Sequence, residues 1–237
     1  MTIKGIGFDL GETLMYNNDI KLSWSKYYKK ALKNGFHAIN KKMDDERFEE
    51  FVEIFEKYNT RTNPREKEIK SNVIFNEIRK ICKINISETI ILEDTFFSFF
   101  QKDFKIYKDV EKVLAEIKQY KIKTGILTDS PYGRTQGFLA ENIKGIYENI
   151  DIILSSVEIG YRKPNITGYL RLANALKIKP LEMLYVGNEE KDIVGANKAG
   201  ISSILINRTG RKLNYGETYQ FKNLIDMWHY LREQNVV

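Results

Sequence analysis

The chain is poor in several residue types, and each scarcity excludes a class of protein. Its 237 residues include one cysteine, Cys82, so no disulfide can form within the chain. A lone cysteine set among isoleucines predicts a buried thiol and a reducing, cytoplasmic location. The two histidines, His37 and His229, lie far apart in the sequence. We find no Ser-His-Asp or Cys-His pattern and no His/Cys cluster of the zinc-binding kind.

Long apolar runs are also missing. No stretch approaches the ~20 apolar residues that a membrane-spanning helix needs, and the N-terminus lacks the basic-then-apolar pattern of a signal peptide. We therefore expect no membrane contact. Hydrophobic residues nevertheless make up 42% of the chain, which is enough for a sizeable core.

The charge balance is basic, with 38 Lys and Arg against 32 Asp and Glu. Such a balance can indicate a nucleic-acid partner or an anionic substrate. The lysines, however, are mixed with acids, and no basic stripe alternates with aromatic residues as in single-strand binders. We predict a solvated basic surface and no nucleic-acid partner.

Two patterns of hydrophobicity divide the chain. Residues 17–100 form a long block, rich in Lys, Glu and aromatic residues, with helical periodicity. It predicts a small bundle with helices at 23–36, 44–58, 66–82 and 92–104. The remainder alternates apolar runs with helix-like segments. Strands are predicted at 3–8, 123–129, 149–156, 182–188 and 202–208, and helices at 109–121, 133–143, 166–178, 191–200 and 221–234.

Alternating strands and helices favour βαβ units and a parallel sheet covered on both faces. We therefore predict an α/β fold. Its core is a Rossmann-like, doubly wound parallel sheet made from residues 1–16 and 101–237, and residues 17–100 form an inserted α-helical domain.

Polar side chains lie at or after the C-terminal ends of four of the predicted strands. They are Asp9, then Thr128 with Asp129, then Lys163 within Arg162-Lys163-Pro164, and finally the run from Asn188 to Asp192. Right-handed crossovers place the C-terminal ends of parallel strands at one edge of the sheet, where ligands of open α/β sheets bind. We expect these side chains to gather there.

The ordered segments "DLGET", "LTDS", "RKP" and "GNEEKD" resemble the four motifs of the haloacid dehalogenase-like superfamily, whose members are mostly phosphatases. The family pattern is Asp-x-Asp-x-Thr, then Thr or Ser, then Lys often before Pro, then Gly-Asp-x-x-x-Asp. The resemblance covers the whole chain. It implies that residues 17–100 are the helical cap that the family inserts after its first motif.

The resemblance implies a Mg²⁺-dependent phosphatase that acts on a small phosphorylated metabolite through an aspartyl-phosphate intermediate. Asp9 would be the nucleophile, with Thr128 and Lys163 as the other catalytic residues, and Thr13 would brace the loop. Phosphate binding would fall to Thr128, Asp129 and Lys163. A metal site for Mg²⁺, a hard cation that prefers oxygen ligands, would draw on Asp9, Gly11, Asn188 and Asp192.

Two residues depart from the family pattern. Gly11 stands where the family has its general acid, so it keeps a backbone carbonyl for the metal but cannot transfer a proton. Asn188 replaces an acid, so it offers the metal an amide oxygen without charge. Glu12 could take over proton transfer, although its offset by one residue would normally aim it elsewhere. Glu189 or Glu190 could restore charge near the metal.

Two alternatives stay open. A 2-haloacid dehalogenase, in which Asp9 attacks carbon, needs neither Mg²⁺ nor a leaving-group acid, so Gly11 is compatible with it. A weakly active or inactive scaffold that binds a metabolite or a protein is the other alternative. Substrate choice would lie in the cap, and the candidate contacts there are Tyr16, Trp24, Arg61 and Arg65.

Overall fold

A six-stranded sheet forms one half of the molecule. The computed structural model describes residues 2–20, 23–101, 103–135 and 143–237. The strands are β1 (Gly5–Phe8), β4 (Lys123–Thr128), β5 (Ile152–Ser155), β6 (Met183–Gly187), β7 (Ser202–Ile206) and β8 (Tyr219–Phe221). Their order is β5-β4-β1-β6-β7-β8, and every pairing between neighbours is parallel. The predicted α/β fold with a parallel sheet is confirmed.

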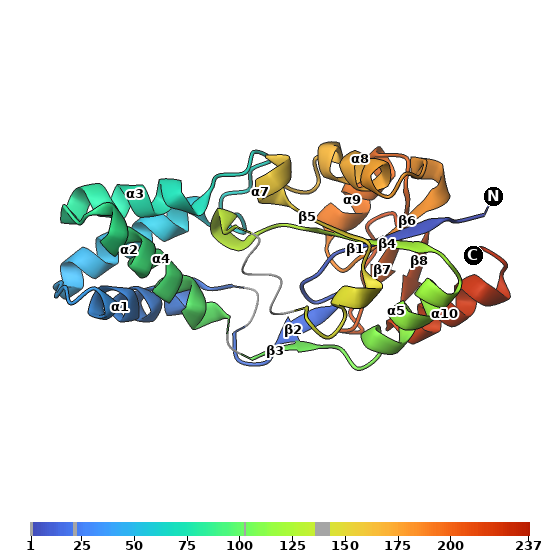
Figure 1. Ribbon diagram of the computed structural model, residues 1–237, viewed down its shortest axis with the longest axis horizontal. Coiled ribbons are helices and arrows are strands. Elements are labelled where there is room, and N and C mark those ends of the chain that lie inside the picture. Colours follow the sequence, from blue (N-terminus) through green and yellow to red (C-terminus); the bar gives the residue numbers. More distant parts are fainter. Residues whose placement is uncertain (1, 21–22, 102, 136–142) are drawn as a thin grey trace.

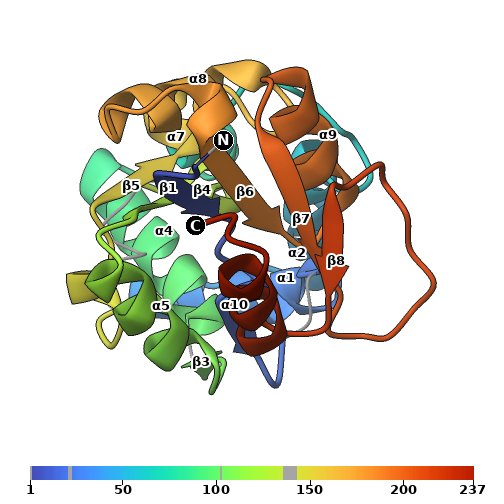
Figure 2. The same ribbon diagram turned by 90° about the vertical axis from the view of Figure 1, so that its right-hand side faces the viewer.

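Helices cover both faces of this sheet (Figure 2). One face carries α5 (Val110–Gln119) and α10 (Leu224–Glu233), and the other carries α8 (Ile166–Ala175) and α9 (Glu190–Lys198). Shorter turns complete the connections, namely α7 (Ser156–Ile159), η2 (Pro131–Gly133), η3 (Tyr147–Asn149) and η4 (Pro180–Glu182). Each strand that feeds the predicted site therefore ends at the same edge of a sheet buried on both sides.

The sequence of β1 explains how closely the layers pack. Ile6 and Phe8 are fully buried in the larger of two hydrophobic clusters. Gly7 faces the other layer, where an added Cβ would lie 2.8 Å from the Leu172 side chain of α8. Since real Cβ atoms do not approach that closely, glycine at this position lets α8 pack directly against the strand that ends in Asp9.

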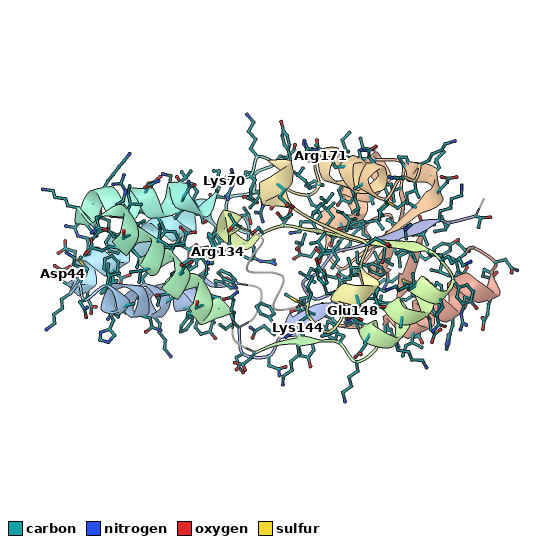
Figure 3. All side chains as sticks on the ribbon, in the orientation of Figure 1. Asp44, Lys70, Arg134, Lys144, Glu148 and Arg171 are labelled. Carbon is teal, nitrogen blue, oxygen red and sulfur yellow. The ribbon has the colours of Figure 1, made fainter. Side chains whose placement is uncertain are left out.

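The other half of the molecule is a helical block. It contains η1 (Ser25–Tyr27), α1 (Tyr28–Ala38), α2 (Asp45–Tyr58), α3 (Ser71–Cys82) and α4 (Ile86–Phe100), all at one end of the molecule (Figure 1). Its core is built from stacked and edge-on rings, and the fully buried ones include Phe36, Phe51, Phe55, Phe75 and Phe96. Figure 3 labels Asp44 at the far end of this block, where its side chain caps α2.

Three of the helices predicted in this block have wrong bounds. The helix expected at 23–36 is instead η1 followed by α1, which ends at Ala38. The helix expected at 66–82 begins at Ser71, because the preceding backbone pairs with the sheet half: Arg162 N–H donates to Glu66 O at 2.7 Å, and Glu68 N–H donates to Gly160 O at 3.0 Å. The helix expected at 92–104 spans Ile86–Phe100 instead. Asn85 starts it early with a capping box, which satisfies the first N–H groups of the helix.

A two-stranded antiparallel ribbon, β2 (Met15–Asn17) with β3 (Phe104–Ile106), joins the two halves. Neither this ribbon nor β8 was predicted from the sequence. β2 straddles the boundary expected at 16/17, whereas β3 lies just after the boundary expected at 100/101, and the division into two domains stays a proposal. The helix predicted at 133–143 falls mostly on residues 136–142, which lie outside the described residues.

Further contacts tie the halves together. Arg134 of the sheet half lies at the junction in Figure 3, and it forms ion pairs with Glu93 at 3.2 Å and Asp94 at 2.6 Å on α4.

Cys82, expected to be buried, is only half-buried, and burial raises the pKa of its thiol to about 11. In the described part of the chain, no helix has the length and apolarity required to cross a membrane.

Candidate active site

The first motif forms a tight loop at the end of β1. The Asp9 N–H donates to Val186 O at 2.8 Å, which continues the pairing with β6 by one residue, and only 8% of Asp9 is exposed. The Thr13 hydroxyl donates at 3.1 Å to the Asn188 amide oxygen and lies 3.4 Å from Asp9 Oδ2. Thr13 thus braces the loop as expected and also brings oxygens of the first and last motifs around one hydroxyl.

Lys163 sits between two buried carboxylates. Its ammonium donates to Asp9 Oδ1 and, at 2.6 Å, to Asp192 Oδ1. Burial disfavours the charged ammonium, but Asp192 and Asp9 outweigh it and raise the pKa of Lys163 well above its ordinary value. Burial also disfavours the charged form of Asp9, and this raises the pKa of its carboxyl to about 7. The positive charge of Lys163 opposes that rise, and the negative charge of Asp192 adds to it. The site therefore holds a fixed cation beside the predicted nucleophile.

Both carboxylate oxygens of Asp192 accept hydrogen bonds. One oxygen accepts from Lys163, and the other accepts from the N–H groups of Asn188 at 3.1 Å and Glu189 at 2.9 Å. These last bonds satisfy N–H groups at the start of α9, where the helix dipole also favours an acid. The structure thus places Asp192 behind Lys163, holding both the lysine and the loop that presents Asn188.

Thr128 is the last residue of β4 and Asp129 follows it, and both line the same cavity. Asp129 accepts from the Lys163 N–H at 3.0 Å and from the Lys191 ammonium at 3.0 Å. Burial opposes its ionisation, but Arg162, Lys191 and Lys163 together lower its pKa to about 2. Since an ionised carboxylate repels phosphate, any phosphate contact of Asp129 must come from its backbone N–H, while its side chain positions Lys191.

The residues expected to compensate for the missing acids are placed differently. Glu189 pairs with Arg61 of the helical block at 3.0 Å and with Lys191 at 3.0 Å, so its carboxylate is occupied. Glu12 lines the cavity and accepts from the Tyr107 hydroxyl at 3.0 Å. Its backbone has a φ of +59°, which is uncommon for a residue with a Cβ.

Gly11 has no steric need to be glycine. A Cβ built at this position meets nothing within 4 Å. Gly11 is also not among the glycines with positive φ in the described part of the chain, which are Gly133, Gly160, Gly200, Gly210 and Gly216. The backbone would therefore accept the aspartate that the family carries here.

A cavity of about 560 Å³ opens between the sheet edge and the helical block. Of the cap candidates, Tyr16, Trp24 and Arg61 line it. Arg65 instead donates to the Tyr58 carbonyl at 2.8 Å and has a structural role. Tyr58 and Tyr132 also line the cavity and were not expected there, and Arg162 and Lys191 line it although the sequence assigned them no role. Only the last two carried a signal, because they lie within or beside the quoted motifs.

The side chains at this edge supply oxygen donors rather than a cluster of acids. Among the described residues, no group of three or more His, Cys, Asp or Glu side chains is arranged to hold a metal ion. A cation here could draw on at most two such side chains, so neutral oxygens, namely an amide and backbone carbonyls, would have to complete its ligands.

Comparison with known proteins gives consistent matches. A family model described as haloacid dehalogenase-like hydrolase matches residues 3–200. The chain is 27% identical over 213 residues to a glyceraldehyde 3-phosphate phosphatase of Methanopyrus kandleri, covering 87% of this chain and 84% of that protein. It is 27% identical over 120 residues to the pyrophosphatase PpaX of Bacillus anthracis, covering 51% and 55%. A solved 2-haloacid dehalogenase from Pseudomonas syringae pv. Tomato DC3000 has a TM-score of 0.70 at 20% identity, covering 98% and 100%.

Proposed function

The chain belongs to the haloacid dehalogenase-like hydrolase family and is a hydrolase, and we propose that it is a phosphatase acting on a small phosphorylated metabolite. The observation that carries this proposal is the buried ammonium of Lys163, held between Asp192 and Asp9, the latter of which lines the cavity. A carboxylate that attacks an anionic phosphate needs a fixed cation beside it, because the two negative charges otherwise repel each other. The relatives named as phosphatases support the same reaction class.

The reaction proceeds in two displacements. A carboxylate oxygen of Asp9 attacks phosphorus, the bond from phosphorus to the leaving oxygen breaks, and that oxygen departs with the electron pair. Lys163 and the Thr128 hydroxyl stabilise charge on the phosphoryl oxygens. Water then attacks the aspartyl phosphate and releases inorganic phosphate and the Asp9 carboxylate. Gly11 supplies no proton to the leaving oxygen, so that proton comes from solvent or from another residue of the cavity.

The donors present fit Mg²⁺. Asp9 Oδ2 and the Asn188 amide oxygen both lie within hydrogen-bond range of the Thr13 hydroxyl, and the Gly11 carbonyl belongs to the same loop. These are hard oxygen ligands of the kind that Mg²⁺ prefers. When bound, the ion would offset the negative charge of the phosphate. Both oxygens of Asp192 already accept hydrogen bonds, so Asp192 would contact the ion through a water molecule rather than directly.

The dehalogenase alternative keeps one supporting observation. Gly11 leaves no acid beside Asp9, and attack on carbon needs none. The oxygens of Asp9 and Asn188 around Thr13, however, suit a metal that a dehalogenase does not require. A panel of phosphate monoesters, assayed with Mg²⁺ and with chelator beside 2-chloropropionate, separates the two reactions.

The matched variant for this panel is Asp9→Asn, which keeps the size of the side chain and removes the nucleophile. We expect the wild type to release phosphate from at least one monoester and Asp9→Asn to lose all but a few per cent of that turnover. Chloride release without phosphate release would identify the dehalogenase. Inactivity on every compound would favour the binding-scaffold alternative.

A further inference from the structure

Six aromatic residues form part of the wall of the cavity beside Asp9, among polar and charged residues. Both halves of the molecule and the ribbon between them contribute to the wall. The rings that line it are those of Tyr16, Trp24, Tyr58, Phe104, Tyr132 and Tyr215. The volume of about 560 Å³ equals that of about nineteen water molecules at ~30 Å³ each, so a whole ring system fits beside the phosphate.

Several of these rings are held in place by their neighbours. Trp24 stacks on Phe100 with ring centroids 4.0 Å apart and an angle of 6° between the planes. Tyr16 packs on Tyr107 at 4.5 Å. Rings fixed in this way present flat apolar faces to a ligand and lose little side-chain freedom when it binds.

Tyr132 occupies an unfavourable backbone conformation. Its φ of +50° lies in the left-handed region that residues with a Cβ rarely adopt. From this backbone its ring reaches Trp24 at 5.6 Å and Phe55 at 5.6 Å, and it also lines the cavity. Strain kept at a site in this way points to a requirement for the side chain there.

The cations of the cavity are already paired. Among the described residues, three cationic side chains line it. Arg61 lies 3.0 Å from Glu189, Lys191 lies 3.0 Å from Asp129, and Arg162 lies 2.5 Å from Glu68. A second phosphate or a carboxylate on the substrate would have to displace one of these partners, and such a group would gain little.

We infer that the substrate is a phosphate monoester whose leaving group carries an aromatic ring and no second anionic group; this rests on the phosphatase proposed above. The fixed rings supply affinity for the ring, and the paired cations disfavour diphosphates and carboxylated substrates. A triose phosphate, as named for one relative, has no apolar face to bury against this wall.

The test compares phosphates whose alcohols have similar acidity, so that leaving-group reactivity does not contribute. We expect kcat/KM for benzyl phosphate to exceed that for ethyl phosphate by about 50-fold, within the ~10–200-fold range that apolar contacts supply. We expect 4-methylbenzyl phosphate to exceed 4-carboxybenzyl phosphate by at least about tenfold. Equal values within either pair would overturn the inference, as would a preference for glyceraldehyde 3-phosphate or pyrophosphate.

Variants link the preference to the wall. Trp24→Leu should lower kcat/KM for benzyl phosphate about tenfold more than that for ethyl phosphate. The matched control is Tyr120→Leu, which removes an exposed ring that packs on Trp228 and does not line the cavity. If Trp24→Leu lowered kcat/KM equally for benzyl phosphate and ethyl phosphate, the result would contradict the assigned role of the wall.

A binding measurement separates failure of this inference from failure of the phosphatase proposal. If no ester is hydrolysed, including 4-nitrophenyl phosphate, the proposed function is wrong. Benzylphosphonate and ethylphosphonate can still be titrated against the fluorescence of Trp24, with Trp24→Phe identifying its signal against buried Trp228. Tighter binding of benzylphosphonate supports the aromatic site, and equal binding overturns it.

Discussion

The ammonium of Lys163 lies 2.6 Å from Asp192 Oδ1 and also donates to Asp9. Two buried carboxylates, one after β1 and one in α9, therefore share a single cation. Asp192 in turn holds the N–H groups of Asn188 and Glu189. The last motif thus fixes the position of the cation beside the nucleophile. A substitution at Lys163 or at Asp192 should therefore alter the charge around Asp9.

Lys163→Met should abolish more than its own positive charge. It leaves Asp9 and Asp192 buried without a cation, so we expect stability to fall by about 3–5 kcal/mol and turnover to fall at least ~100-fold. Urea unfolding and phosphate release measure the two effects. The control is Lys112→Met, which removes an exposed lysine on α5. Turnover within a few-fold of wild type would show that Lys163 does not serve the reaction.

Asp129 should make the free energy of unfolding fall as the pH is lowered from about 4 to 2. Its folded pKa of about 2 lies below the ordinary value of 3.8, so its contribution is present above pH 3.8 and is lost as the pH falls towards 2. The shift corresponds to roughly 2 kcal/mol at neutral pH. Asp129→Asn should lower stability at pH 7 and flatten its pH dependence between pH 4 and 2. Asp19→Asn, at an exposed position, serves as the control, and identical slopes would contradict the assignment.

The sheet was predictable because its strands are short apolar runs that end in polar residues. Residues 183–187, for example, are all buried. Segments whose partners are distant in the chain were not predictable. The backbone at 66–68 has helical composition, yet its hydrogen bonds go to residues 160–162. β8 has only three residues, too few for its alternating pattern to be recognised, and it forms a strand by pairing with β7.

In the site, too, the meeting of motif residues was predictable from the sequence, whereas contacts with distant segments were not. The order of the motifs predicted that Asp9 and Lys163 would meet, because the ends of parallel strands share one edge of the sheet. The pairing of Glu189 could not be read from sequence, since its partner Arg61 lies 128 residues away on the helical block. Tyr132 carries no motif, and only the folded chain brings its ring to the cavity.

Asn188→Asp should tighten Mg²⁺ binding, because it turns a neutral ligand into a charged one beside Asp9. The increase in melting temperature with added Mg²⁺ measures this binding without reference to activity, since a ligand bound to the folded state stabilises it. We expect the half-maximal Mg²⁺ concentration to fall at least about tenfold, with Ca²⁺ titrated for comparison. No stabilisation of either protein by Mg²⁺ would contradict the metal site.

Gly11→Asp tests whether the missing acid limits the enzyme. The backbone accepts the new side chain, since a Cβ there meets nothing within 4 Å and the residue is not among those with positive φ. In the wild type, esters with acidic leaving groups, such as 4-nitrophenyl phosphate, should react far faster than alkyl phosphates. Proton transfer contributes about 10²–10⁴-fold, so restoring the acid should raise the alkyl rate towards the aryl rate.

The added carboxylate also brings negative charge next to Asp9, so the fairer comparison carries Asn188→Asp as well and recovers metal affinity. Gly11→Asn, with and without that second change, is the matched control, because it has the same shape and no acid. The measured quantity is the ratio of aryl to alkyl kcat, which should narrow only in the aspartate variants. A wild-type ratio near one would instead assign proton transfer to another group of the cavity, and Glu12, held by Tyr107 at 3.0 Å, would be the first residue to replace by glutamine.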